Sequence, residues 1–133
     1  MKTLHNVVGF GGLLVFLVTG LYMKTQFPAL YDGNEASRMM FRASHIYLLL
    51  AALLNIVVAN QSLPQLRQSL HIVWTLASLL LVAAPMLFCI GFFYESPSYN
   101  IGRPFTVWAV WGMLVGVLLQ SLLRYVCGRT PRC

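Results

Sequence analysis

A chain of 133 residues in which 59% of the residues are hydrophobic and only 9% are charged has too few charges to cover a water-facing surface. Soluble domains carry about 25% charged residues and about 45–50% apolar residues. The same composition excludes an intrinsically disordered chain, which combines low hydrophobicity with high net charge. Three cysteines do not make a disulfide scaffold. The mean hydropathy of +0.74 therefore indicates an integral membrane protein.

Four stretches are long and apolar enough to form transmembrane helices, which need about 20 residues each. They cover residues 5–23, 41–59, 70–93 and 105–123. Turn-forming residues separate them, with Phe27-Pro28 marking the first loop, and Pro85 is predicted to kink the third span. The runs are continuously apolar, which excludes a β-barrel. The sequence predicts an all-α, antiparallel four-helix bundle that forms one membrane domain over residues 1–133.

The basic residues predict the orientation of this bundle. With four spans, both termini and the second loop lie on one side, which carries a net charge of +5 from Lys2, Arg67, Arg124, Arg129 and Arg132. The other side carries four basic and three acidic residues, a net charge of +1. Because basic residues favour the cytoplasmic side, we expect cytoplasmic termini in a bacterial inner membrane. The high pI then reflects topology and anionic lipid, with no nucleic-acid partner.

Few residues offer catalytic chemistry. The sequence contains no HExxH, CxxC or P-loop motif. Asp32, Glu35 and Glu95 all lie outside the predicted spans, so the spans hold no carboxylate for a proton relay. The polar residues inside the spans include Asn55 and Gln120, which we expect to form hydrogen bonds between helices.

Two histidines open spans at the cytoplasmic side, His5 on the first span and His71 on the third. Each begins a helical face of small or weakly polar residues, which lets another helix or a flat cofactor approach the backbone. Two neutral imidazoles on facing helices are a common pair of axial ligands for a b-type haem. The alternative is that both rings lie at headgroup level without a ligand.

The segment Lys2-Thr-Leu-His5, with Gly11-Gly12-Leu-Leu after it, resembles the first span of small four-helix membrane haem proteins. These are the protoporphyrinogen-oxidase-like and copper-resistance-D-like families, and Leu70-His71 is similar to the beginning of their third span. The resemblance implies haem ligation by His5 and His71. It does not imply oxidase activity.

A second distinctive block runs from Ser37 to Asn55, and it resembles a pattern of uncharacterised four-span bacterial inner-membrane proteins. Three of its side chains are cationic or protonatable and occupy positions i, i+4 and i+7, so they share one helical face. They are Arg38, Arg42 and His45. With Arg103 on the third loop they form a candidate site for an anion or a lipid phosphate. The alternative is that the arginines extend to the headgroups and pair with Glu35 and Glu95.

Small residues mark candidate helix contacts. Gly9 and Gly12 share the face of His5 on the first span, and Gly112 and Gly116 form a GxxxG motif on the fourth. The motif indicates close packing either within the bundle or between two copies of the chain, and the partners we expect are the bilayer and other membrane subunits.

These features indicate two alternative functions, and they do not establish whether the chain is an enzyme. The first is an accessory or assembly component of a membrane complex without catalysis of its own. The second is a b-type haem protein with His5 and His71 as axial ligands.

Overall fold

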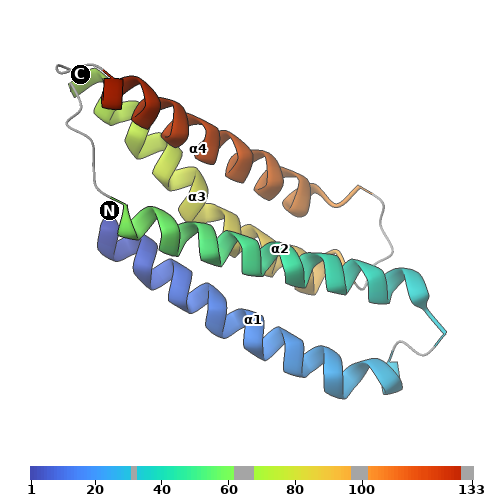
Figure 1. Cartoon of the computed structure of the whole chain (residues 1–133). Coiled ribbons are helices and arrows are strands. Elements are labelled where there is room, and N and C mark those ends of the chain that lie inside the picture. Colours follow the sequence, from blue (N-terminus) through green and yellow to red (C-terminus); the bar gives the residue numbers. More distant parts are fainter. Residues whose placement is uncertain (31–32, 62–67, 97–101, 130–133) are drawn as a thin grey trace.

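The computed structural model contains four long helices and describes residues 1–30, 33–61, 68–96 and 102–129 (Figure 1). The helices are α1 (Lys2–Leu30), α2 (Glu35–Asn60), α3 (Gln68–Tyr94) and α4 (Pro104–Arg129). Each is long and apolar enough to cross a membrane. The predicted all-α architecture with four helices is therefore confirmed. Arg67 and Arg132, two of the basic residues that predict the orientation, lie outside the described residues.

The first helix is longer than predicted. Phe27-Pro28 does not mark a loop, because α1 continues to Leu30. A proline has no backbone N–H to donate, so it removes one hydrogen bond of the helix. Because this proline lies so close to the end of α1, the missing bond affects only the last turn.

The second helix begins at Glu35, well before the predicted start at residue 41. The preceding Asn34 caps it, because its side chain accepts a hydrogen bond from the backbone N–H of Ser37 at 3.1 Å. Arg38 and Arg42 are therefore part of a regular helix.

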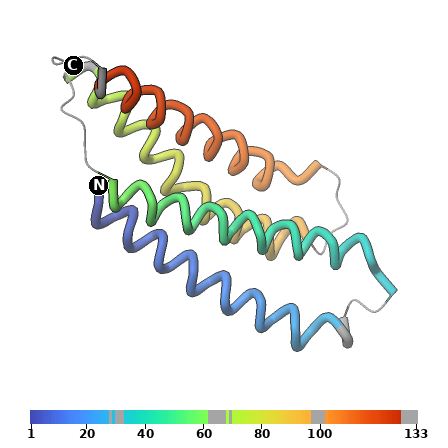
Figure 2. The backbone as a smooth tube through the Cα atoms, viewed as in Figure 1, coloured from blue at the N-terminus to red at the C-terminus, as the bar shows by residue number. Residues whose placement is uncertain are grey.

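Consecutive helices run antiparallel, so the beginning of α1 and the end of α4 lie at one end of the molecule, the termini end (Figure 2). The end of α1, the beginning of α2, the end of α3 and the beginning of α4 lie at the opposite end, the loop end (Figure 1). Helix α1 packs along α2, α2 along α3, and α3 along α4, whereas α1 contacts α3 only lightly. Helices α1 and α4 lie on opposite sides of the central pair α2 and α3, so this antiparallel bundle is open.

The main core lies where α2, α3 and α4 meet. It contains seven buried apolar side chains: Leu48, Ala51, Leu81, Ala84, Phe88, Ala109 and Met113. A smaller aromatic core near the loop end joins Phe27, Phe41 and Phe92 from the first three helices. Together these two cores join all four helices.

Candidate functional site

Polar side chains gather inside the bundle at the termini end. Each helix contributes one residue to this group, which we call the polar cluster: His5, Asn55, Ser78 and Gln120. All four are buried, with at most 3% of any of them exposed. They also lie within the stretches that are apolar enough to span a membrane. Polar groups at such depth are costly and commonly mark functional sites.

Asn55 joins α2 to α3 through its amide group. Its Nδ2 donates to the carbonyl of Ala51 at 2.9 Å and to the carbonyl of Leu81 on α3 at 2.8 Å. Leu81 lies four residues before Pro85, which has no N–H to donate to that carbonyl. The Asn55 side chain therefore supplies the hydrogen bond that the proline cannot make, as neighbouring helices do for prolines within membranes.

The same amide determines which ring nitrogen of His5 carries the proton. Because Asn55 Nδ2 donates to two carbonyls, Oδ1 is the acceptor that faces His5 Nδ1, 2.7 Å away. In the neutral imidazole, Nδ1 therefore carries the proton and Nε2 presents a lone pair. His5 Nε2 is buried and has no hydrogen-bond partner among the described residues.

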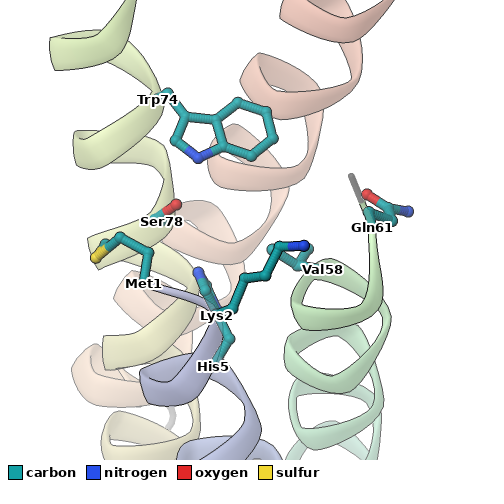
Figure 3. A pocket seen from close by; sticks show the side chains of 7 residues that line it. All are labelled: Met1, Lys2, His5, Val58, Gln61, Trp74 and Ser78. Carbon is teal, nitrogen blue, oxygen red and sulfur yellow. The ribbon is translucent and has the colours of Figure 1, made fainter. Parts of the chain in front are cut away.

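The pocket beside His5 is small (Figure 3). Its volume is about 10 Å³, which is the space that one water molecule needs. The side chains around it come from α1, α3 and the end of α2: Met1, Lys2, His5, Val58, Gln61, Trp74 and Ser78.

Helix α4 forms the far side of the polar cluster. Gln120 Nε2 donates to Ser78 Oγ at 2.9 Å, whereas Gln120 Oε1 is buried without a partner among the described residues. One turn later, the guanidinium of Arg124 lies over the ring of Trp74, 5.1 Å from its centroid. Asn55 and Gln120 thus both form hydrogen bonds between helices, and that prediction is confirmed.

The two predicted haem ligands are not brought together. His71 is exposed near the beginning of α3, where its Nδ1 lies 3.5 Å from Thr75 Oγ1, and it does not line the pocket beside His5. Trp74, three residues further along α3, already lies beside the first residues of α1, so His71 lies beyond the point where α1 begins. A porphyrin needs far more room than one water molecule, and this arrangement therefore does not fit a haem between the two rings.

The four residues of the predicted anion site also lie apart. Arg38 and Arg42 line an open pocket of about 310 Å³ between α1 and α2 at the loop end. Arg38 Nη1 lies 3.5 Å from Glu35 Oε1 in an exposed pair. His45 instead packs on α1, and Arg103 lies at the beginning of α4.

His45 is held by α1. The hydroxyl of Thr19 donates to the carbonyl of Phe16 at 3.0 Å, and it accepts from His45 Nδ1 at 2.9 Å. The imidazole stacks on the Phe16 ring with centroids 4.0 Å apart. Gly20 leaves room for it, because a Cβ there would lie 3.2 Å from the imidazole. His45 therefore contributes to the contact between α1 and α2.

Glu95 caps the beginning of α4, a role that the sequence did not predict. Its carboxylate accepts from the backbone N–H groups of Phe105 at 2.5 Å and Thr106 at 3.2 Å, and from the Thr106 hydroxyl. Arg103 Nε lies 3.9 Å from the same carboxylate, and Arg103 Nη2 donates to Ser44 on α2. A negative charge at the N-terminus of a helix satisfies its free N–H groups and its dipole.

Replacing Glu95 with glutamine should lower the free energy of unfolding by about 1–3 kcal/mol, because hydrogen bonds to a charged group weaken and one oxygen becomes a donor facing donors. Unfolding in mixed detergent micelles measures this loss. Glu35→Gln is the matched control, since that side chain is 76% exposed. It should change stability by no more than about 0.5 kcal/mol. Equal losses in the two variants would contradict the cap.

The glycines of the first span lie against α2. A Cβ at Gly9 would lie 2.5 Å from Ile56 Cγ1, and a Cβ at Gly12 would lie 2.9 Å from the Cβ of Ala52. The absence of side chains at these positions allows α1 to approach α2 closely.

The GxxxG motif lies against α3, and its two glycines differ. A Cβ at Gly116 would lie 2.9 Å from the carbonyl oxygen of Ala77, whereas a Cβ at Gly112 would meet only Leu80 Cδ2 at 3.7 Å, an ordinary contact. The close contact at Gly116 is therefore with α3 of the same chain.

Comparison of the chain with protein-family models, with curated proteins and with solved structures found no match. Among the described residues, no group of three or more histidine, cysteine or acidic side chains is placed to hold a metal ion. The resemblances noted in the sequence stay predictions, and function has to be inferred from the geometry of this chain.

Proposed function

We propose that this chain is an integral protein of the bacterial inner membrane that acts as an accessory or assembly component of a membrane complex, without catalysis of its own. Four helices of sufficient length and apolarity support the membrane location. The net charges that the sequence gives to the two sides, +5 for the side of the termini and +1 for the other, support cytoplasmic termini.

An apolar groove between α1 and α3 is the observation that carries this proposal. Helix α1 contacts α3 only lightly, and a groove of about 480 Å³ lies between them. Only apolar or small residues line it, including Gly11, Gly12, Val15, Pro85, Met86 and Ile90. The groove therefore offers an apolar surface inside the membrane.

This groove suits a helix of a partner subunit. Membrane helices associate where small residues let their backbones approach. Gly12 already packs on Ala52, but a Cβ at Gly11 would meet nothing within 4 Å. Gly11 is thus a small residue on the groove that its own chain does not use. A lipid acyl chain is the competing occupant, and the following experiment separates the two.

Gly11→Leu should fold normally and lose the partner, because leucine projects into the groove without a clash in its own chain. A photo-crosslinking amino acid in place of Met86, which lines the groove and is 65% exposed, should capture one discrete membrane protein in cells. We expect Gly11→Leu to lower the yield about tenfold, the effect of about 1.4 kcal/mol on affinity.

Val18→Leu is the matched control for that experiment. It enlarges an exposed side chain of α1 that does not line the groove, so the crosslink should persist. Crosslinks to lipid alone, in the original chain as in Gly11→Leu, would contradict a partner helix.

Haem binding is the second candidate, favoured by the lone pair that His5 Nε2 presents. It stands second because His71 is exposed and the pocket beside His5 is the size of one water molecule. Absorption spectra of oxidised and reduced protein from haem-supplemented cells test it, and we expect no Soret band. A stoichiometric Soret band that disappears in both His5→Ala and His71→Ala would reverse the order.

A further inference from the structure

Among the described residues, Arg124 has no acidic partner. Its side chain is half-buried on the Trp74 ring, and its Nε and Nη2 are buried with no hydrogen-bond partner among the described residues. The three acidic residues of the chain are remote from it. Glu35 and Glu95 lie at the loop end, and Asp32 comes just before α2 in the sequence, outside the described residues.

This placement favours an anion from outside the chain. Removing a charge from water is costly unless an opposite charge compensates for it. Coulomb attraction is also stronger beside apolar groups than in water. A guanidinium that lies against an indole, with unused N–H groups and no carboxylate nearby in the described part of the chain, therefore gains from a bound anion.

A pocket of about 130 Å³ lies beside Arg124, between α2 and α4. Its polar lining residues are Gln61, Gln120, Ser121 and Arg124. Leu54, Val57 and Val117 are among its apolar walls. Gln120 Oε1 is a buried acceptor without a partner among the described residues. Complete small-molecule sites occupy about 300–1,000 Å³, so this pocket suits a headgroup whose remainder lies outside it.

We infer that this pocket binds the headgroup of an anionic phospholipid. The phosphate accepts hydrogen bonds from Arg124, a hydroxyl of the headgroup donates to Gln120 Oε1, and the acyl chains run along Leu54, Val57 and Val117. The depth agrees, because Arg124 lies three residues before the end of the apolar stretch at Cys127, about 4.5 Å along the helix axis. Basic pockets between membrane helices at this depth are typical sites for anionic lipids.

Native mass spectrometry of the detergent-purified chain tests this inference with equal amounts of phosphatidylglycerol and phosphatidylcholine. Phosphatidylcholine also has a phosphate but has no net charge and no headgroup hydroxyl. We expect one phosphatidylglycerol to be retained, with a preference of about tenfold that Arg124→Gln removes, because charge-assisted hydrogen bonds to phosphate are strong. Lys2→Gln removes an exposed charge at the termini end, and this variant should keep the preference.

Gln120→Glu keeps the experiment decisive if Arg124→Gln does not fold. Its carboxylate gives Arg124 a partner at i, i+4 within the chain and repels phosphate. This variant should lose the lipid preference and melt no lower than the original chain. Equal retention of the two lipids, or a preference that survives in Gln120→Glu, would overturn the inference. Stabilisation by inorganic phosphate equal to that by phosphatidylglycerol would show a site for a soluble anion and would overturn the lipid assignment.

Discussion

Replacing Asn55 with leucine should lower the free energy of unfolding by about 2–4 kcal/mol, because two buried polar groups lose their partners at once. The Leu81 carbonyl, left free by Pro85, would have no donor, and His5 Nδ1 would lose its acceptor. Leucine has a similar size, so the loss reflects hydrogen bonding more than packing. Unfolding in mixed detergent micelles measures it.

Asn60→Leu is the matched control for this prediction. Asn60 lies on the same helix and is exposed, and its side chain donates to the Ile56 carbonyl of that helix at 2.8 Å. We expect a change of no more than about 0.5 kcal/mol. A loss as large as that of Asn55→Leu would show that leucine itself disturbs the helix.

The role of Pro85 can be measured by a double-mutant cycle with Asn55. Pro85→Ala restores the N–H that reaches the Leu81 carbonyl, so that carbonyl no longer depends on the Asn55 amide. Asn55→Leu should therefore cost about 1 kcal/mol less in the Pro85→Ala background than in the original chain. Identical costs in the two backgrounds would refute the link between the proline and the asparagine.

The four helices could be predicted because their signal is compositional. Runs of about 20 apolar residues have few alternatives in a chain with so little charge. The ends of the helices were harder to predict, since they depend on local hydrogen bonds. The Asn34 cap extends α2 by more than a turn, and a proline so close to the end of α1 does not end that helix.

The polar cluster was predicted only in part. Hydrophobic pattern identified Asn55 and Gln120 as residues within spans that bond between helices, but it could not say that Asn55 bonds to His5, 50 residues away. The free carbonyl before Pro85 was the available signal, because a proline within a helix needs a donor from elsewhere. His71 shares a helical face with Ser78, yet it is exposed, because periodicity does not show where α1 begins relative to α3.

Arg124 illustrates a different limit. In the sequence it is one of several basic residues at a span end, a position where arginine commonly reaches the headgroups. That it has no acidic partner among the residues the structure describes follows only from topology, which places Glu35 and Glu95 at the opposite end. The charge count that predicts orientation treats all basic residues alike, whereas the structure separates this one from the rest.

Replacing Gly9 with alanine should lower the free energy of unfolding by about 1–3 kcal/mol, the cost of overpacking a close contact. The added methyl group would lie 2.5 Å from Ile56 Cγ1 and 3.1 Å from the carbonyl oxygen of Ala52. The isoleucine side chain can rotate, but the backbone cannot, so α1 has to move away from α2. Gly9 lies one turn after His5 on the same face of α1, and this movement should also weaken the bond between His5 and Asn55.

Gly11→Ala distinguishes this contact from the general effect of alanine in a helix. A Cβ at Gly11 meets nothing within 4 Å, and alanine favours helix over glycine by about 1 kcal/mol. Gly11→Ala should therefore leave stability unchanged or raise it, while Gly9→Ala lowers it. The chemical shift of the His5 Nδ1–H group, observed by nitrogen NMR, should move toward the value of a weaker hydrogen bond in Gly9→Ala alone. Equal stability of the two variants would mean that α1 does not approach α2 closely at Gly9. The bond between His5 and Asn55 depends on the same approach of the two helices, so it would then need another explanation.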